Sequence, residues 1–254
     1  MTTVDRAGVK LSYEETGSGS PPMVFVHGWT CDRSFFAPQV EHFKVNHRVL
    51  GVDLRGHGAS DAPEDGYSMS VHADDIAWVC EDLEIEGAVV VGHSMGAIIS
   101  VELAARHPRL VSSLVLVDAG PIAPPPGVAG LLAQLVEGLA GPGAIDVRRA
   151  LVEGLFLPTD DPMLRERVLD SMLAVPDHVA LGCFQGMTLW QGEEAIGEVR
   201  VPTLAVHADQ PINEPEMLGA LCPSLTNART PGVGHFNQLL AATEVNDLIE
   251  RFIG

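Results

Sequence analysis

A serine between two glycines is the first group in the chain whose type and spacing could do chemistry. The pentapeptide Gly-His-Ser-Met-Gly occupies residues 92–96, with Ser94 at its centre. It follows a β-branched run at 89–91 and precedes an apolar segment, 97–106, with helical spacing. We predict a strand, a sharp turn and a helix, because glycines on both sides remove the Cβ atoms that would collide there. The hydroxyl would stand above the sheet at a helix N-terminus, where a forming oxyanion is stabilised.

A serine hydroxyl is a weak nucleophile unless a base removes its proton, and histidine is the usual base near neutral pH. Among ten histidines, we favour His235. It follows a short candidate strand, lies in the glycine-rich loop 231–236 (PGVGHF) and comes after the serine in chain order. His93 is the neighbour of Ser94, and we interpret it as a spacer because adjacent side chains on a sharp turn diverge.

These motifs resemble those of the α/β-hydrolase fold family, and the likeness runs along nearly the whole chain. Loop 231–236 is similar to the family's histidine loop, and residues 53–60 (DLRGHGAS) are similar to its Asp-x-Arg-Gly-x-Gly-x-Ser turn. The resemblance implies a catalytic triad that contains Ser94 and His235. It also implies an oxyanion hole made by the backbone N–H groups of Trp29, the third residue of a His-Gly-x segment, and Met95. We interpret His27, which opens that segment, as a structural brace.

The acid of the triad has two leading candidates, and Glu214 is a distant third. Most family members carry it after the strand that follows the lid; that position here is Pro211, and the nearest acid, Asp209, comes two residues earlier. A minority carry it one strand earlier, where Asp118 directly follows the apolar run 114–117. We favour Asp118 and keep Asp209 as the alternative. Either carboxylate would orient the imidazole and stabilise its cation.

Alternating strand and helix patterns predict an α/β protein, with a mostly parallel sheet flanked by helices, as in the α/β-hydrolase fold. The expected strands include residues 9–14, 23–26, 48–53, 114–117, 203–207 and 228–230, and the expected helices include 70–83, 97–106, 214–221 and 244–253. Between 121 and 197 the β-branched runs disappear and apolar residues take helical spacing. We predict a helical cap (lid) there, inserted into a core domain formed by residues 1–120 and 198–254.

Composition narrows the class of partner. The 254 residues contain 15 Lys and Arg against 34 Asp and Glu, a formal net charge of −19, which disfavours nucleic acid and anionic membrane surfaces. The N-terminal residues lack the apolar core of a signal peptide, and the apolar stretch 128–140 is too short to span a bilayer. We expect a cytoplasmic protein that acts on a small molecule. No metal-ligand spacing or phosphate-binding fingerprint implies a metal or organic cofactor, and the oligomeric state stays open.

The expected chemistry is hydrolysis through an acyl-enzyme intermediate. The side chains expected around the mouth of the site are apolar: Trp29, Phe35, Phe36, Met95 and Ile122. They favour an uncharged, fairly hydrophobic carboxylic ester or lactone of modest size. Alternatives stay open, because a fold and a triad do not fix a function. They are a perhydrolase or haloperoxidase, a cofactor-free dioxygenase, and a small-molecule receptor that retains the triad.

Overall fold

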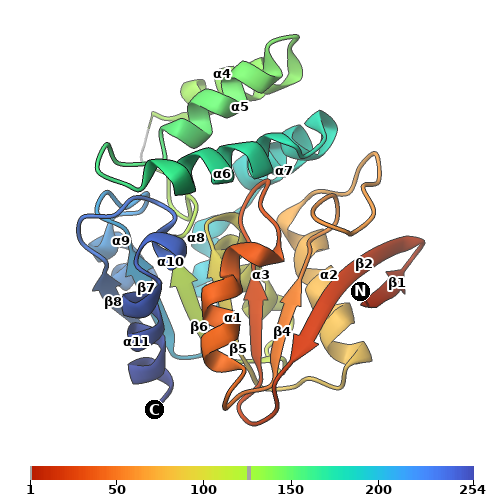
Figure 1. Ribbon diagram of the computed structural model, residues 1–254, viewed down its shortest axis with the longest axis vertical. Helices are drawn as coiled ribbons and strands as arrows, with labels where there is room; N and C mark the ends of the chain where they lie inside the picture. Colours follow the sequence, from red (N-terminus) through yellow and green to blue (C-terminus); the bar gives the residue numbers. More distant parts are fainter. Residues whose placement is uncertain (1, 125–126) are drawn as a thin grey trace.

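A mostly parallel sheet forms the centre of the molecule (Figure 1). The computed structural model describes residues 2–124 and 127–254, and in these residues eight strands pair in the order β1-β2-β4-β3-β5-β6-β7-β8. Their bounds are β1 Thr2–Arg6, β2 Val9–Thr16, β3 Met23–Val26, β4 Val49–Val52, β5 Ala88–His93, β6 Val111–Val117, β7 Thr203–His207 and β8 Leu225–Arg229. The β1–β2 and β2–β4 pairs are antiparallel, and every pair from β4 to β8 is parallel. The carboxyl ends of β3 to β8 therefore meet at one edge of the sheet.

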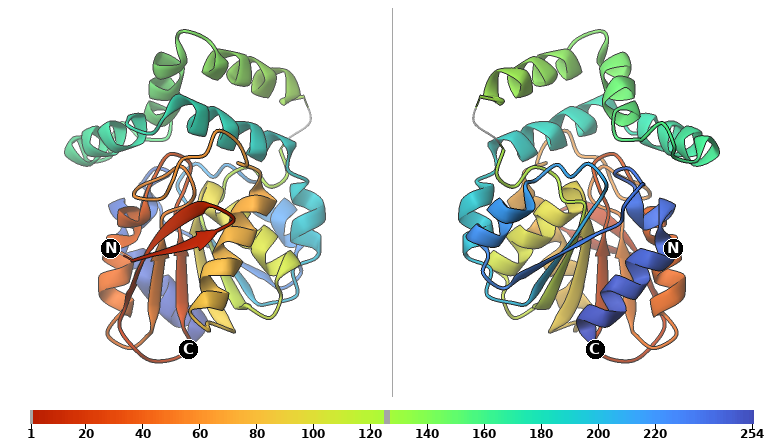
Figure 2. Two further views of the ribbon diagram at one scale, coloured as in Figure 1. Left: turned by 90° about the vertical axis from the view of Figure 1, so that its right-hand side faces the viewer. Right: turned by 90° about the vertical axis from the view of Figure 1, so that its left-hand side faces the viewer.

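The central strands are apolar on both faces because helices cover both faces. In β3, Met23 and Phe25 contribute to one hydrophobic cluster, and Val24 and Val26 contribute to the other. Helices α1 and α11 pack on the first face, and α2 and α3 pack on the second (Figure 2). The helices around the sheet are η1 Arg33–Phe36, α1 Ala37–Phe43, α2 Met69–Asp82, α3 Met95–Arg106, α9 Pro215–Leu221, α10 Asn237–Leu240 and α11 Ala242–Ile253.

A helical insertion connects β6 to β7. Its helices are α4 Ala129–Ala140, α5 Ala144–Glu153, α6 Pro162–Leu173, α7 Asp177–Leu189 and α8 Gly192–Gly197. Figure 1 shows α6 and α7 above the carboxyl ends of the strands, with α4 and α5 farther from the sheet. The division into a core domain, 1–120 and 198–254, and a cap, 121–197, stays a prediction, and residues 125–126 of that cap lie outside the described part of the chain.

The predicted fold class is confirmed. The expected strands at 23–26 and 203–207 coincide with β3 and β7, and the expected helix at 70–83 is α2 shifted by one residue. Strand β1 and helix α1 were not predicted from the sequence. Within the described residues, no helix combines the length and the apolar character needed to cross a bilayer.

Candidate functional site

Ser94 lies on the turn between β5 and α3, with backbone angles of φ 55° and ψ −119°. A positive φ is rare for a residue with a side chain and marks local strain. The flanking glycines make the turn possible, because a Cβ at Gly92 would overlap the carbonyl oxygen of Gly96, and a Cβ at Gly96 would overlap that of Val26. The chain therefore presents Ser94 at the carboxyl edge of the sheet and at the N-terminus of a twelve-residue helix.

His235 lies in the loop after β8, and its ring contacts Asp118. Nδ1 of His235 is 2.6 Å from Oδ2 of Asp118, and both side chains are buried. The second carboxylate oxygen of Asp118 accepts the Ala208 amide at 2.9 Å, which fixes its orientation. Asp118 directly follows β6, the neighbour of β5, so parallel pairing brings it to the edge that carries Ser94.

Asp209, the other candidate acid, has a different partner. Its Oδ1 accepts the amide of Gly232 at 3.0 Å, and its own amide donates to the carbonyl of Val233. No hydrogen bond joins Asp209 to His235 in the part of the chain that the structure describes. Asp209 shapes the histidine loop, whereas Asp118 contacts the imidazole.

His93 does more than separate a strand from a serine. Its Nε2 donates to the main-chain carbonyl of His235 at 3.0 Å, and the centroids of the two imidazole rings are 4.7 Å apart. Burial holds the pKa of His93 well below its usual value, so the ring is neutral with its proton on the donating nitrogen. The interpretation of His93 as a spacer is corrected, because this side chain turns toward the histidine loop.

The segment after β3 runs beside Ser94. A Cβ at Gly28 would lie 3.2 Å from Cβ of Ser94, so only glycine allows this approach without displacement. The next residue, Trp29, is 7 % exposed, and Met95 is fully buried. Among the hydrogen bonds of residues 2–124 and 127–254, none has the Trp29 or the Met95 amide as its donor. Two backbone N–H groups near Ser94 thus have no protein acceptor in the described structure.

Two histidines tie this segment to the turn after β4. Nε2 of His27 accepts the Leu54 amide at 3.0 Å, and Nε2 of His57 accepts the Thr30 amide at 3.2 Å. Their Nδ1 atoms pair with the carbonyls of Gly28 and Arg55, so each ring is neutral and carries its proton on Nδ1. Burial lowers the pKa of His27 to about 4 and that of His57 to about 3. His27 acts as a structural brace.

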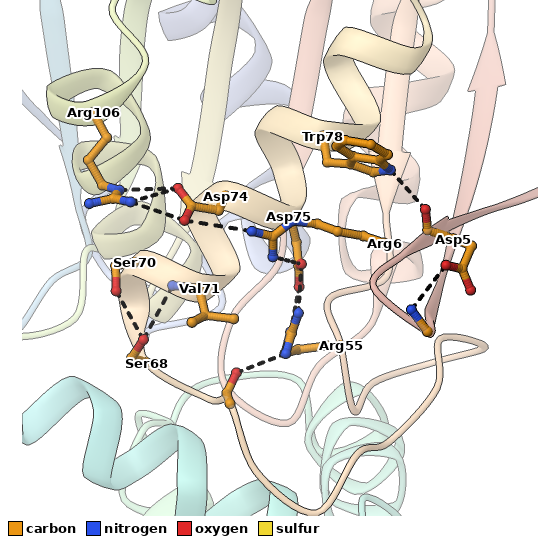
Figure 3. Close-up of polar contacts among 12 residues, drawn as sticks. Asp5, Arg6, Arg55, Ser68, Ser70, Val71, Asp74, Asp75, Trp78 and Arg106 are labelled. Atoms are coloured by element: carbon orange, nitrogen blue, oxygen red, sulfur yellow. Dashed lines mark hydrogen bonds and ion pairs between the residues drawn. The ribbon is translucent and has the colours of Figure 1, made fainter.

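An ion-pair network joins the same turn to α2 and β1 (Figure 3). Arg55 makes two contacts with Asp75, of 2.5 and 2.7 Å, and a third with the carbonyl of Gly66 at 3.3 Å. Arg6 adds a contact with Asp75 at 2.7 Å. Asp75 is 1 % exposed, so these partners keep its buried charge compensated.

No three His, Cys, Asp or Glu side chains are grouped to hold a metal ion within the described residues.

A model of the α/β-hydrolase fold family matches residues 21–242. The chain belongs to the α/β-hydrolase fold family. One relative of this α/β hydrolase is the 2-(acetamidomethylene)succinate hydrolase of Mesorhizobium japonicum, 43 % identical over 118 residues. Another is the bifunctional esterase/perhydrolase DCH of Acinetobacter calcoaceticus, 40 % identical over 124 residues.

These two alignments cover 46 % and 48 % of this α/β hydrolase, and 42 % and 44 % of the relatives. The chain therefore spans less than half the length of either relative. A solved structure of Est816, an N-acyl homoserine lactone degrading enzyme, superimposes with a TM-score of 0.83 at 28 % identity and covers 99 % of this chain and 100 % of that one. The neighbours of this α/β hydrolase thus include esterase, lactonase and perhydrolase enzymes.

Proposed function

We propose that this α/β hydrolase is a serine hydrolase that cleaves a small, uncharged, fairly hydrophobic carboxylic ester or lactone through an acyl-enzyme intermediate. The observation that carries the proposal is the 2.6 Å hydrogen bond from Nδ1 of His235 to Asp118, with the His235 backbone joined to the residue before Ser94. This arrangement leaves Nε2 as the nitrogen available to a substrate or to the serine. A serine nucleophile needs a base that a carboxylate orients, and the contact between His235 and Asp118 supports the proposal on this point.

In the proposed reaction, Oγ of Ser94 attacks the carbonyl carbon while Nε2 of His235 takes the hydroxyl proton. The bond to the leaving oxygen then breaks, and His235 returns the proton to that oxygen. Water repeats the sequence on the acyl-enzyme, releases the acid and restores Ser94. Asp118 stays ionised throughout, because its role is to hold the tautomer and stabilise the imidazolium.

The negative oxygen of the tetrahedral intermediate needs donors that are already in place. The amides of Trp29 and Met95 meet this need, since neither donates elsewhere among the described residues. Backbone donors cost no reorganisation during the reaction, and losing one such donor typically lowers kcat by about 10²–10³. The N-terminus of α3 adds a favourable partial positive charge.

The side chains that we expect around these groups support the proposed substrate class. Trp29, Met95 and Ile122 are buried and apolar, and the ring of Phe184 from α7 meets Trp29 edge-on at 5.7 Å. A formal net charge of −19 opposes anionic substrates as well. Both observations support an uncharged ester or lactone, and the likeness to the lactone-degrading Est816 supports the same class.

The experiment is a substrate panel with a matched variant. Wild type and Ser94→Ala are assayed with p-nitrophenyl esters of increasing chain length, with N-acyl homoserine lactones and with 2-(acetamidomethylene)succinate, and both are treated with a fluorophosphonate probe. We expect turnover of neutral esters or lactones and labelling of the wild type alone, with activity reduced by about 10³ or more in the variant. A preference for the succinate would overturn the substrate class. Equal activity in both proteins would overturn the serine mechanism.

A second activity is favoured by the relative from Acinetobacter calcoaceticus, whose name couples esterase and perhydrolase. In that reaction, hydrogen peroxide replaces water as the nucleophile that attacks the acyl-enzyme, so the product is a peracid. The test adds hydrogen peroxide to the ester assay and measures the peracid formed. Peracid that depends on Ser94 would support the activity, and free carboxylic acid as the sole product would exclude it.

A further inference from the structure

The helical insertion contacts the histidine loop through the turn between α5 and α6, residues 155–160. The carbonyl of Leu155 accepts the His235 amide at 2.9 Å. Oδ1 of Asp160 accepts the Gly234 amide at 3.2 Å, and the ring of Phe156 stacks on that of Phe236 with centroids 4.9 Å apart. Three consecutive residues of the histidine loop are thus held by one turn of the insertion.

Asp160 is the only charged side chain in this contact among the described residues, and it is buried, with 8 % of its surface exposed. Its Oδ2 accepts the Leu157 amide at 2.7 Å, so one carboxylate joins its own turn to a loop 74 positions away. Hydrogen bonds from amides to a carboxylate are about twice as strong as those between neutral groups. The buried charge is compensated by these two donors.

The fit is close on the side of the loop. A Cβ at Gly234 would lie 2.5 Å from Oδ2 of Asp160 and 2.8 Å from the carbonyl oxygen of Leu155. The residue before the histidine therefore has room only for a hydrogen atom. The turn and the backbone next to His235 are therefore packed directly against each other.

We propose that Asp160 is a positioning residue for His235. The proposed function above is its premise, because positioning has a catalytic effect only if His235 is the base. Three hydrogen bonds hold His235 in the loop after β8. Its amide donates to the carbonyl of Leu155, its carbonyl accepts from His93, and its ring contacts Asp118. Asp160 holds the first of these in place through the preceding amide, so the helical insertion forms part of the active-site framework.

The test compares Asp160 with the next residue, which has the same side chain and a different task. The Asp161 side chain is exposed and accepts the Met163 amide at 2.9 Å as the N-cap of α6. We would measure kcat, KM and thermal midpoint for D160A, D160N, D161A and D161N with the p-nitrophenyl ester that the wild type prefers. Amide hydrogen exchange at Gly234 and His235 is measured in the same proteins.

We expect kcat to fall about 10–100-fold in D160A with KM unchanged, since misplacement by about an ångström costs on that order. D160N retains one acceptor without the charge and should lie between D160A and wild type. Amide hydrogen exchange at Gly234 and His235 should be slowest in the wild type, faster in D160N and fastest in D160A. D161A should lose thermal stability because alanine cannot cap α6, and D161N should lose little because asparagine caps a helix about as well as aspartate. In both Asp161 variants, kcat and the two exchange rates should stay at wild-type values.

The proposal would be overturned if D160N and the wild type had equal kcat and equal exchange rates at Gly234 and His235. If D160A does not fold, this comparison alone tests the proposal. An equal loss of kcat in the Asp160 and Asp161 variants would also overturn it, because a general loss of stability would then explain both. Failure of the proposed function has a different signature. The wild type would escape fluorophosphonate labelling, while the exchange measurements would still report whether Asp160 holds the loop.

Discussion

His93 and His235 are 142 positions apart in the chain, and Nε2 of the first donates to the main-chain carbonyl of the second at 3.0 Å. The residue that precedes the candidate nucleophile is thereby bonded to the backbone of the candidate base. His93 is the last residue of β5, a strand that is buried at every position, so the sheet holds the His93 backbone in place. This hydrogen bond therefore fixes the position of the histidine loop relative to the sheet.

Replacing His93 should therefore affect both stability and activity. In His93→Leu, the buried carbonyl of His235 loses its donor, and we expect the free energy of unfolding to fall by about 1–3 kcal/mol. We expect kcat/KM to fall about tenfold, which corresponds to about 1.4 kcal/mol. His93→Gln keeps an N–H donor at a similar reach and should retain more of both. Urea denaturation and ester kinetics measure the two effects, and equal behaviour of the two variants would refute this role.

The sequence predicted the elements that local patterns determine. The strand before Ser94, the turn and the helix after it have signatures within twenty residues, and so do β3 and β7. The roles of His93 and Asp160 have no such signature. The contact of His93 joins residues 142 positions apart, and that of Asp160 joins residues 74 positions apart. No local periodicity or motif predicts contacts between such distant segments. The strand β1 was missed because its exposed, polar residues lack the apolar alternation that indicates a strand.

The two candidate acids can be separated by matched amide substitutions. Asp118→Asn would allow the His235 ring to adopt the tautomer whose proton lies on Nε2, which cannot accept the serine proton. We expect kcat to fall by about 10⁴, the size of loss that the same change causes in other serine triads. Asp209→Asn keeps an oxygen that can accept the Gly232 amide, so we expect a small change. Steady-state kinetics on one ester decides, and the reverse order of effects would assign the acid to Asp209.

Acid should destabilise the protein through the histidines that brace the segment after β3. In the unfolded chain a histidine has a pKa of about 6.5, whereas the native pKa of His27 is about 4 and that of His57 about 3. Above pH 6.5 both states are neutral and stability does not depend on these groups. As the pH falls below that value the unfolded state binds protons that the native state does not, so the free energy of unfolding decreases by about 1.4 kcal/mol per pH unit for each histidine.

Urea denaturation at pH 7, 6 and 5 measures this slope. The variant His57→Gln offers a carbonyl oxygen to the Thr30 amide and has no group that titrates in this range. We expect the slope of stability against pH to be smaller in this variant by about 1.4 kcal/mol per unit. An unchanged slope would show that His57 is not neutral and buried in the native protein.

Removing one partner of the buried ion pair between Arg55 and Asp75 should cost far more stability than removing one partner of the more exposed pair between Arg106 and Asp74, which Figure 3 also draws. Asp75→Asn leaves the guanidinium of Arg55 buried without a compensating charge, and we expect a loss of about 3–5 kcal/mol in the free energy of unfolding. Arg106→Met removes a pair that water screens, and we expect a loss of about 0–1 kcal/mol.

The same substitutions also test how the turn after β4 supports catalysis. Arg55 precedes His57 by two residues, and His57 accepts the amide of Thr30, the neighbour of Trp29. Loosening Arg55 should therefore disturb the proposed oxyanion donor, and kcat should fall in Asp75→Asn under conditions where the protein is still folded. Arg106→Met has no such connection and should keep wild-type kcat. A folded Asp75→Asn protein with wild-type kcat would show that the buried pair stabilises the fold without positioning the donor, because the Thr30 amide would then be held independently of the turn.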